Sequence, residues 1–113
     1  NRNLLDNSLS LINSIAIDSG LDNIEVDSNG DLYIGSHPKL FDFIKHAKDK
    51  TNLSPSQIFK VSSDYESVNE IFLSDGSDLS ASTVGAFYNG KLLIGALFDN
   101  HFLYCELEDD TIY

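Results

Sequence analysis

The stretch that decides the fold is Leu21–Pro38, LDNIEVDSNGDLYIGSHP, because it returns in altered form near the end of the chain. Asn29–Gly35 (NGDLYIG) aligns with Asn89–Gly95 (NGKLLIG) at an offset of 60 residues, and the seven residues before each also align without a gap. Each copy predicts a strand, a tight Asn-Gly turn and a second strand, because both central positions of such a turn need positive φ. A hairpin repeated at this spacing indicates repeated β-sheets, such as propeller blades.

The composition is that of one acidic globular domain. The chain has 113 residues, 42% of them hydrophobic and 22% charged, which is ordinary for a single domain with its own core. A net charge of −11 argues against a nucleic-acid or anionic-membrane surface, and it suits either a solvated surface or a cationic partner such as a hard metal ion. No apolar run approaches the roughly 20 residues of a membrane span. The chain begins NRNLL and contains no methionine, so we expect the C-terminal part of a longer protein.

Short apolar runs separated by Gly, Asp, Asn and Ser predict an all-β fold. Outside the two hairpins the expected strands are Ser14–Asp18, Ile58–Ser62, Ser67–Ser74 and Phe102–Leu107. Lys39–Lys50 is ambiguous, because its apolar residues fit a helical stripe and also alternate as in a buried strand. Lys48–Gln57 is expected to be a polar loop, marked by Pro55. One blade is expected from the four strands Ile58–Ser62, Ser67–Ser74, Val84–Tyr88 and Leu92–Leu97.

These residues resemble the C-terminal third of the serum paraoxonase/arylesterase family, from Ser14 to Leu107. The most specific blocks are Asp22-Asn23, Gly35–Pro38, Ser82–Val84, Gly90–Gly95 and Leu103–Leu107. The resemblance implies that residues 1–113 are a partial β-propeller domain, about the last two of six blades, with the upstream blades missing. It also implies calcium (Ca²⁺) in a central tunnel and hydrolysis of lactones and aryl esters.

Asp22 and Asn23 match the Asp-Asn pair with which the family binds its catalytic calcium. Carboxylate and amide oxygens are ligands that calcium prefers. The repeat aligns this pair with Ser82-Thr83, which in a propeller is the start of an innermost strand beside the tunnel. Neighbouring residues on a regular strand point to opposite faces, so both reach one ion only if the backbone is irregular there. The alternative is that Asp-Asn merely forms a turn.

Four residues are candidates for the family's substrate pocket: His37, Thr83, Leu97 and Phe98. His37 lies in the His-Pro step and is expected at the pocket mouth, although a lone histidine is more often structural. Leu97 and Phe98 match apolar residues that wall the family's pocket, or else they are core. The stretch GALFDNHFLYC is one residue longer than the family's spacing before the cysteine, which allows a rebuilt loop.

No catalytic residue is assigned within the chain, because the family's histidine pair and most calcium ligands are expected upstream of residue 1. His46 and His101 are expected on the surface. Cys105 is the only cysteine, and alone it indicates a small buried thiol or an unpaired reactive one. The resemblance implies instead a disulfide to a cysteine near the N-terminus of the full protein, and hence an oxidising compartment. Asn52-Leu53-Ser54 is a glycosylation sequon whose use is disfavoured by the following proline.

The function implied by the resemblance is calcium-dependent hydrolysis of small esters or lactones by a secreted or membrane-associated enzyme. In that mechanism calcium polarises the scissile carbonyl, and water activated by an absent histidine attacks it. Lipid or membrane association through an absent N-terminal segment is a further expectation, and the chain alone is expected to be inactive. The competing interpretation is a non-catalytic propeller, an interaction module whose calcium is structural or lost.

Overall fold

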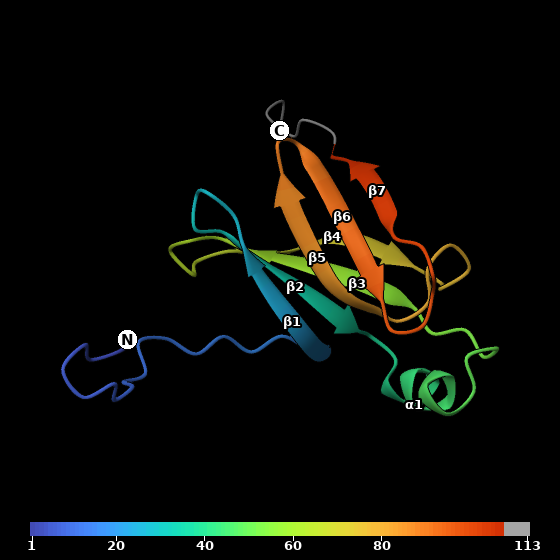
Figure 1. The fold of residues 1–113 in the computed structure, drawn as a ribbon, viewed down its shortest axis with the longest axis horizontal. Coiled ribbons are helices and arrows are strands. Elements are labelled where there is room, and N and C mark those ends of the chain that lie inside the picture. Colours follow the sequence, from blue (N-terminus) through green and yellow to red (C-terminus); the bar gives the residue numbers. More distant parts are fainter. Residues whose placement is uncertain (108–113) are drawn as a thin grey trace.

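The structure, a computed structural model, describes residues 1–107 as two antiparallel β-sheets and one short helix (Figure 1). The elements are β1 (Gly20–Val26), β2 (Leu32–His37), α1 (Leu40–Lys48), β3 (Ser56–Val61), β4 (Val68–Ser74), β5 (Ser82–Tyr88), β6 (Lys91–Ala96) and β7 (Leu103–Glu106). One sheet has the order β1-β2-β3-β4 and the other β5-β6-β7. The predicted all-β class is confirmed, whereas the six-bladed propeller stays a prediction, and residues 108–113 of the predicted domain lie outside the described part. Among residues 1–107 no helix is long and apolar enough to cross a membrane.

The two sheets group the strands differently from the blade expected from the sequence. Strands β3 and β4 pair with β2 and with each other, and not with β5 and β6, so the predicted blade that combined Ile58–Ser62 and Ser67–Ser74 with Val84–Tyr88 and Leu92–Leu97 is wrong. The chain leaves the first sheet after β4, through a turn in which Gly76 has φ +96°. Each sheet therefore begins with one copy of the repeated hairpin.

The second hairpin has the predicted tight turn. Tyr88 pairs with Lys91, and the two residues between them, Asn89 and Gly90, have φ of 51° and 76°. Positive φ at both central positions matches the right-handed twist of the flanking strands.

The first hairpin does not have that turn. Val26 pairs with Leu32, so a longer loop joins the strands, and of the Asn-Gly pair only Gly30 has positive φ. The cause is Asp27, whose carboxylate accepts hydrogen bonds from the backbone N–H groups of Asn29 and Asp31. This local side-chain bonding offers the backbone an alternative to the two-residue turn.

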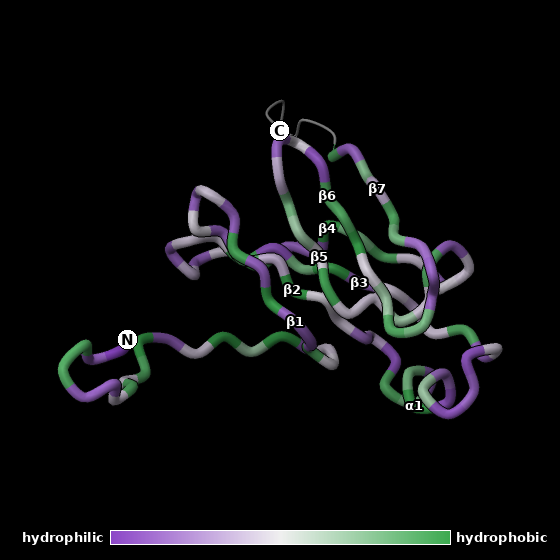
Figure 2. The backbone as a smooth tube through the Cα atoms, viewed as in Figure 1, coloured by the Kyte–Doolittle hydropathy of each residue, from purple (hydrophilic) through white to green (hydrophobic). Residues whose placement is uncertain are grey.

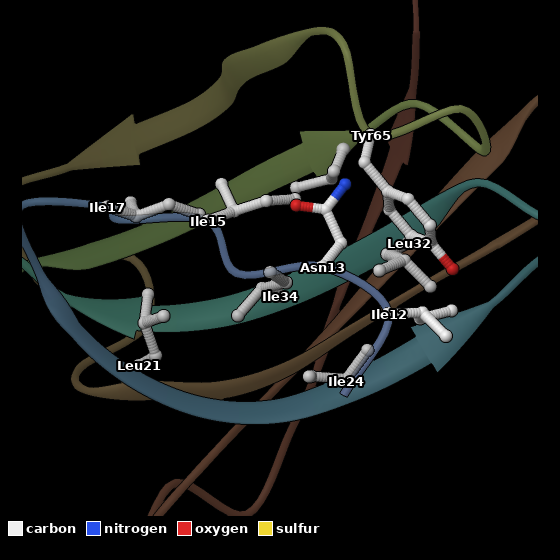
Figure 3. A pocket seen from close by; sticks show the side chains of 10 residues that line it. Ile12, Asn13, Ile15, Ile17, Leu21, Ile24, Leu32, Ile34 and Tyr65 are labelled. Atoms are coloured by element: carbon white, nitrogen blue, oxygen red, sulfur yellow. The ribbon is translucent and has the colours of Figure 1, made fainter. Parts of the chain in front are cut away.

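Two ambiguous or uncertain segments are settled by the structure. Within Lys39–Lys50 the chain forms the helix α1, with Asp42 in its first turn and basic residues in its last turn, an arrangement that complements the helix dipole. Ser14–Asp18 forms no strand, so that prediction is wrong. This segment instead runs across the first sheet (Figure 3), where Ile12, Ile15 and Ile17 face Leu21, Ile24 and Ile34 around an apolar cavity of about 300 Å³.

The core lies between the two sheets. Its buried members are Tyr33, Ile58, Leu79, Leu92 and Ile94. Tyr33 of the first sheet stacks on Phe87 of the second with ring centroids 5.3 Å apart. Figure 2 shows further hydrophobic stretches outside this core, in the N-terminal segment that leads into β1 and in α1. The core holds the starts of β1 and β5 at the same end of the structure.

Candidate functional site

The candidate site lies where the two copies of the repeat begin. Strand β1 carries one extra residue against β2 between Leu21 and Ile24, and β5 carries one extra residue against β6 between Ser82 and Val84. Such a bulge breaks the strict alternation of side chains along a strand. The backbone irregularity that the metal hypothesis requires at Asp22-Asn23 is therefore present.

The two bulges are hydrogen-bonded to each other. The side-chain amide of Asn23 donates through Nδ2 to the backbone carbonyl of Thr83, its counterpart in the repeat, at 3.2 Å. Because a carbonyl oxygen only accepts, this contact determines which way the amide faces and leaves Oδ1 as the free oxygen of Asn23. Gly35 permits the approach, since a Cβ at that position would lie 2.3 Å from the Thr83 carbonyl oxygen.

Asp22 is held by a histidine. Nε2 of His37 donates to Oδ2 of Asp22 at 3.1 Å, and the His37 residue is only 4% exposed. The imidazole also stacks on Phe43 of α1, with ring centroids 3.9 Å apart. His37 is thus a buried partner of the candidate metal-binding carboxylate, and its place in a substrate pocket stays a prediction.

The Asp22–His37 pair is the contact that sequence reasoning missed. A signal for it exists, because the two residues lie at the open end of one predicted hairpin, and Gly20 pairs with His37 in the observed register. Folding the hairpin about its turn brings these positions together. Asp22 lies two residues after Gly20 and therefore on the same face of the sheet as His37.

The donor atoms at this site suit a hard cation. A carboxylate and an amide oxygen are the kinds of ligand that calcium takes, but calcium needs about 6–8 oxygens in total. Within residues 1–107 no group of three or more His, Cys, Asp or Glu side chains gathers to hold a metal ion. Asp22 and Asn23 therefore fit calcium as part of a ligand set that other groups would complete.

Leu97 and Phe98 follow β6 at the same end of the structure. The backbone N–H of Leu97 donates to the carbonyl of Ala81, and the ring of Phe98 lies 5.3 Å from that of His46 on α1. Leu97 is 40% exposed and Phe98 is 46% exposed. Their predicted role as pocket walls, like that of Thr83, stays a prediction.

The remaining histidines differ from each other in burial. His46 is fully buried, so its predicted surface position is wrong. The helix turns it inward, where Nδ1 donates to the carbonyl of Asn52 and the ring meets Phe98. His101 is exposed, as predicted.

Cys105 lies on β7, half-buried and with a free thiol. Burial raises the pKa of this thiol, which lowers the fraction of reactive thiolate. Since the chain has one cysteine, the predicted disulfide requires a partner elsewhere and stays a prediction.

Comparison with known proteins identifies a family. The sequence profile described as Arylesterase matches residues 2–107. "Serum paraoxonase/arylesterase 2" and "Serum paraoxonase/arylesterase 1" of Homo sapiens are each 35% identical over 107 residues, which cover 88% of this chain and 28% of the relative. "Serum paraoxonase/lactonase 3" of Oryctolagus cuniculus is 36% identical over 95 residues, 82% of this chain and 27% of the relative. The chain thus spans less than a third of the length of these relatives. It belongs to the arylesterase family.

Proposed function

We propose that this chain is part of a calcium-dependent carboxylic ester hydrolase of the arylesterase or lactonase type, and that Asp22 and Asn23 bind its calcium. The observation that supports this proposal is the hydrogen bond between the two bulges, which orients the amide of Asn23 next to the carboxylate-bearing residue Asp22. The relatives' names, paraoxonase, arylesterase and lactonase, support small esters and lactones as the substrate class.

Each site residue has a distinct part in this proposal. The carboxylate of Asp22 supplies the negative charge that attracts the cation. The amide of Asn23 supplies Oδ1 as a neutral ligand, while its Nδ2 donates to the carbonyl of Thr83. Calcium bound there would supply a Lewis acid for the scissile carbonyl and for the oxyanion that develops on it. We assign no general base within residues 1–107, because His37 and His46 are buried and His101 bonds the backbone carbonyl of Asp78.

The substrate pocket is proposed to lie beside this point, at the end of β6. Leu97 and Phe98 present partly exposed apolar side chains there, which suit an aryl or lactone ring. Thr83 and His37 are the polar candidates of the same pocket. The two sheets are proposed to be neighbouring propeller blades, since each begins with a copy of the repeat.

A secreted or membrane-associated location is part of the same proposal. The family resemblance supports it through the expected disulfide of Cys105. Association with lipid through a segment outside this chain belongs to it as well.

The test is a comparison of Asp22→Ala and Asn23→Ala in the full-length protein, with Glu25→Ala as the matched control. Glu25 is an exposed carboxylate on the same strand, so its removal changes the charge without touching the site. The rates of hydrolysis of an aryl ester and of a lactone are measured as a function of the free calcium concentration. A sample with excess chelator gives the rate without calcium. We expect both site variants to lose most of their activity, and Asp22→Ala to need more calcium because charge dominates hard-metal affinity.

Three outcomes separate the alternatives. Wild-type rates and an unchanged calcium response in both site variants would show that Asp22-Asn23 is only a structural bulge in β1. An equal loss in Glu25→Ala would assign the effect to general charge. Calcium binding without hydrolysis in the wild-type protein would favour the non-catalytic propeller.

A further inference from the structure

We infer that His37 is a positioning residue for the metal-binding carboxylate: its Nε2–H group holds one oxygen of Asp22, so that the other is presented to the cation. This inference rests on the proposed calcium site. It assigns to His37 a role that acts through Asp22 and requires no contact with substrate.

The hydrogen bond determines the roles of the atoms. A carboxylate accepts hydrogen bonds, so Nε2 of His37 carries the proton and Nδ1 does not take part. Nδ1 is buried and has no hydrogen-bond partner among the described residues. Oδ2 of Asp22 accepts the bond at 3.1 Å, so Oδ1 is the oxygen that this bond leaves fully open to a cation.

The imidazole has little freedom to turn. Its side chain is 5% exposed, whereas that of Asp22 is 33% exposed. Phe43 stacks on one face of the ring with an interplanar angle of 28°. A donor fixed by burial and stacking therefore holds an acceptor that water could otherwise reorient.

Such a support matters at the bulge. Asp22 lies where the pairing of β1 with β2 is interrupted, and a third of its side chain is exposed. Binding a cation would then require the carboxylate to lose rotamer freedom at that moment. Hydrogen-bonding partners of metal ligands remove this cost, and their loss typically weakens metal binding by roughly 10- to 100-fold.

The experiment compares two substitutions of His37 in the full-length protein. His37→Gln places an amide N–H near the position of Nε2 and keeps the donor, whereas His37→Leu keeps the bulk and removes it. Calcium affinity is measured by isothermal titration calorimetry, independently of turnover, and the thermal midpoint is measured in chelator. His101→Leu is the matched control, because His101 is exposed and bonds only the distant carbonyl of Asp78.

We expect His37→Leu to weaken calcium binding by roughly 10- to 100-fold, as for other second-sphere partners. His37→Gln should restore most of the affinity, and His101→Leu should leave it unchanged. Unchanged affinity in His37→Leu would overturn the inference. So would equal losses in Leu and Gln variants, which would point to ring packing alone.

Two further variants keep the result decisive. Asp22→Asn should weaken calcium binding; if it does not, the proposed site and this inference both fail, whereas a loss in Asp22→Asn with none in His37→Leu overturns only the inference. If His37→Leu does not fold, His37→Asn replaces it, because its shorter amide cannot reach Asp22. Wild-type affinity in His37→Asn would then be the contradicting result.

Discussion

Gly35 and Gly95 occupy the same place in the two copies of the repeat, but their surroundings differ. A Cβ on Gly35 would lie 2.3 Å from the carbonyl carbon and oxygen of Thr83, which are backbone atoms. A Cβ on Gly95 would lie 3.1 Å from a methyl group of Val84, which is part of a side chain. The glycine at position 35 is therefore needed for the close approach of β2 to the bulge of β5.

We predict that Gly35→Ala destabilises the protein by about 1–3 kcal/mol or more, the usual cost of forcing atoms into a packed contact. The added methyl pushes the Thr83 carbonyl away and should break its hydrogen bond with Asn23. Gly95→Ala is the matched control and should cost less, because the Val84 side chain can give way. Urea unfolding of both variants measures the difference, and equal losses of stability would contradict the account.

At the scale of elements, the side chains of α1 contact the ends of both sheets. Phe43 and His46 lie three residues apart on one face of the helix. Phe43 stacks on His37 at the end of β2, and His46 contacts Phe98 after β6. The helix thus supports both the candidate metal carboxylate and a candidate pocket wall.

Two phenylalanines on α1 test this arrangement. Phe43→Ala removes a stacked pair, worth about 0.5–1.5 kcal/mol beyond the area it buries. Phe41→Ala removes a ring that is 80% exposed and should change the stability by no more than about 0.5 kcal/mol. Denaturant midpoints of the two variants make the comparison. A larger loss in Phe41→Ala would mean that the helix packs through its other face.

Some features of these elements could be predicted from sequence patterns and others could not. The second Asn-Gly turn, Asn89-Gly90, was predictable, and its backbone φ angles are those of the two-residue turn. The first was not, because the carboxylate of Asp27 bonds the loop locally. The inward position of His46 depends on which face of α1 meets Phe98, a long-range contact that helical periodicity does not contain. Asp22-Asn23 was found through the family resemblance, and its bulge follows from pairing with β2.

At the scale of the whole molecule, the two sheets pack face to face, and each begins with one copy of the repeat. The grouping of β3 and β4 with β1 and β2 was not predictable from strand patterns, because those patterns do not say which neighbours pair. The net charge of −11 comes from acidic residues along the whole chain. Asp22, which pairs with the buried His37, is one acidic residue among many. Charge alone therefore does not locate the candidate site.

Cys105 provides a test at the same scale. We predict that it is oxidised in the full-length protein, joined to a distant upstream cysteine. Closing a loop of that size would add roughly 4–5 kcal/mol of stability in the chain-entropy model. Peptide mapping without reduction checks the pairing. A free Cys105 thiol in secreted material would remove this claim and the argument for an oxidising compartment.

The central claim is that Asp22 and Asn23 bind calcium at the two bulges that the Asn23–Thr83 hydrogen bond joins. A crystal structure of the full-length protein grown with calcium, with anomalous differences to locate the ion, tests it most directly. The account predicts calcium about 2.3–2.6 Å from a carboxylate oxygen of Asp22 and from Oδ1 of Asn23. Nδ2 of Asn23 should remain on the Thr83 carbonyl, and His37 on the other oxygen of Asp22. A calcium ion bound elsewhere, with Asp22 and Asn23 making only hydrogen bonds, would contradict it.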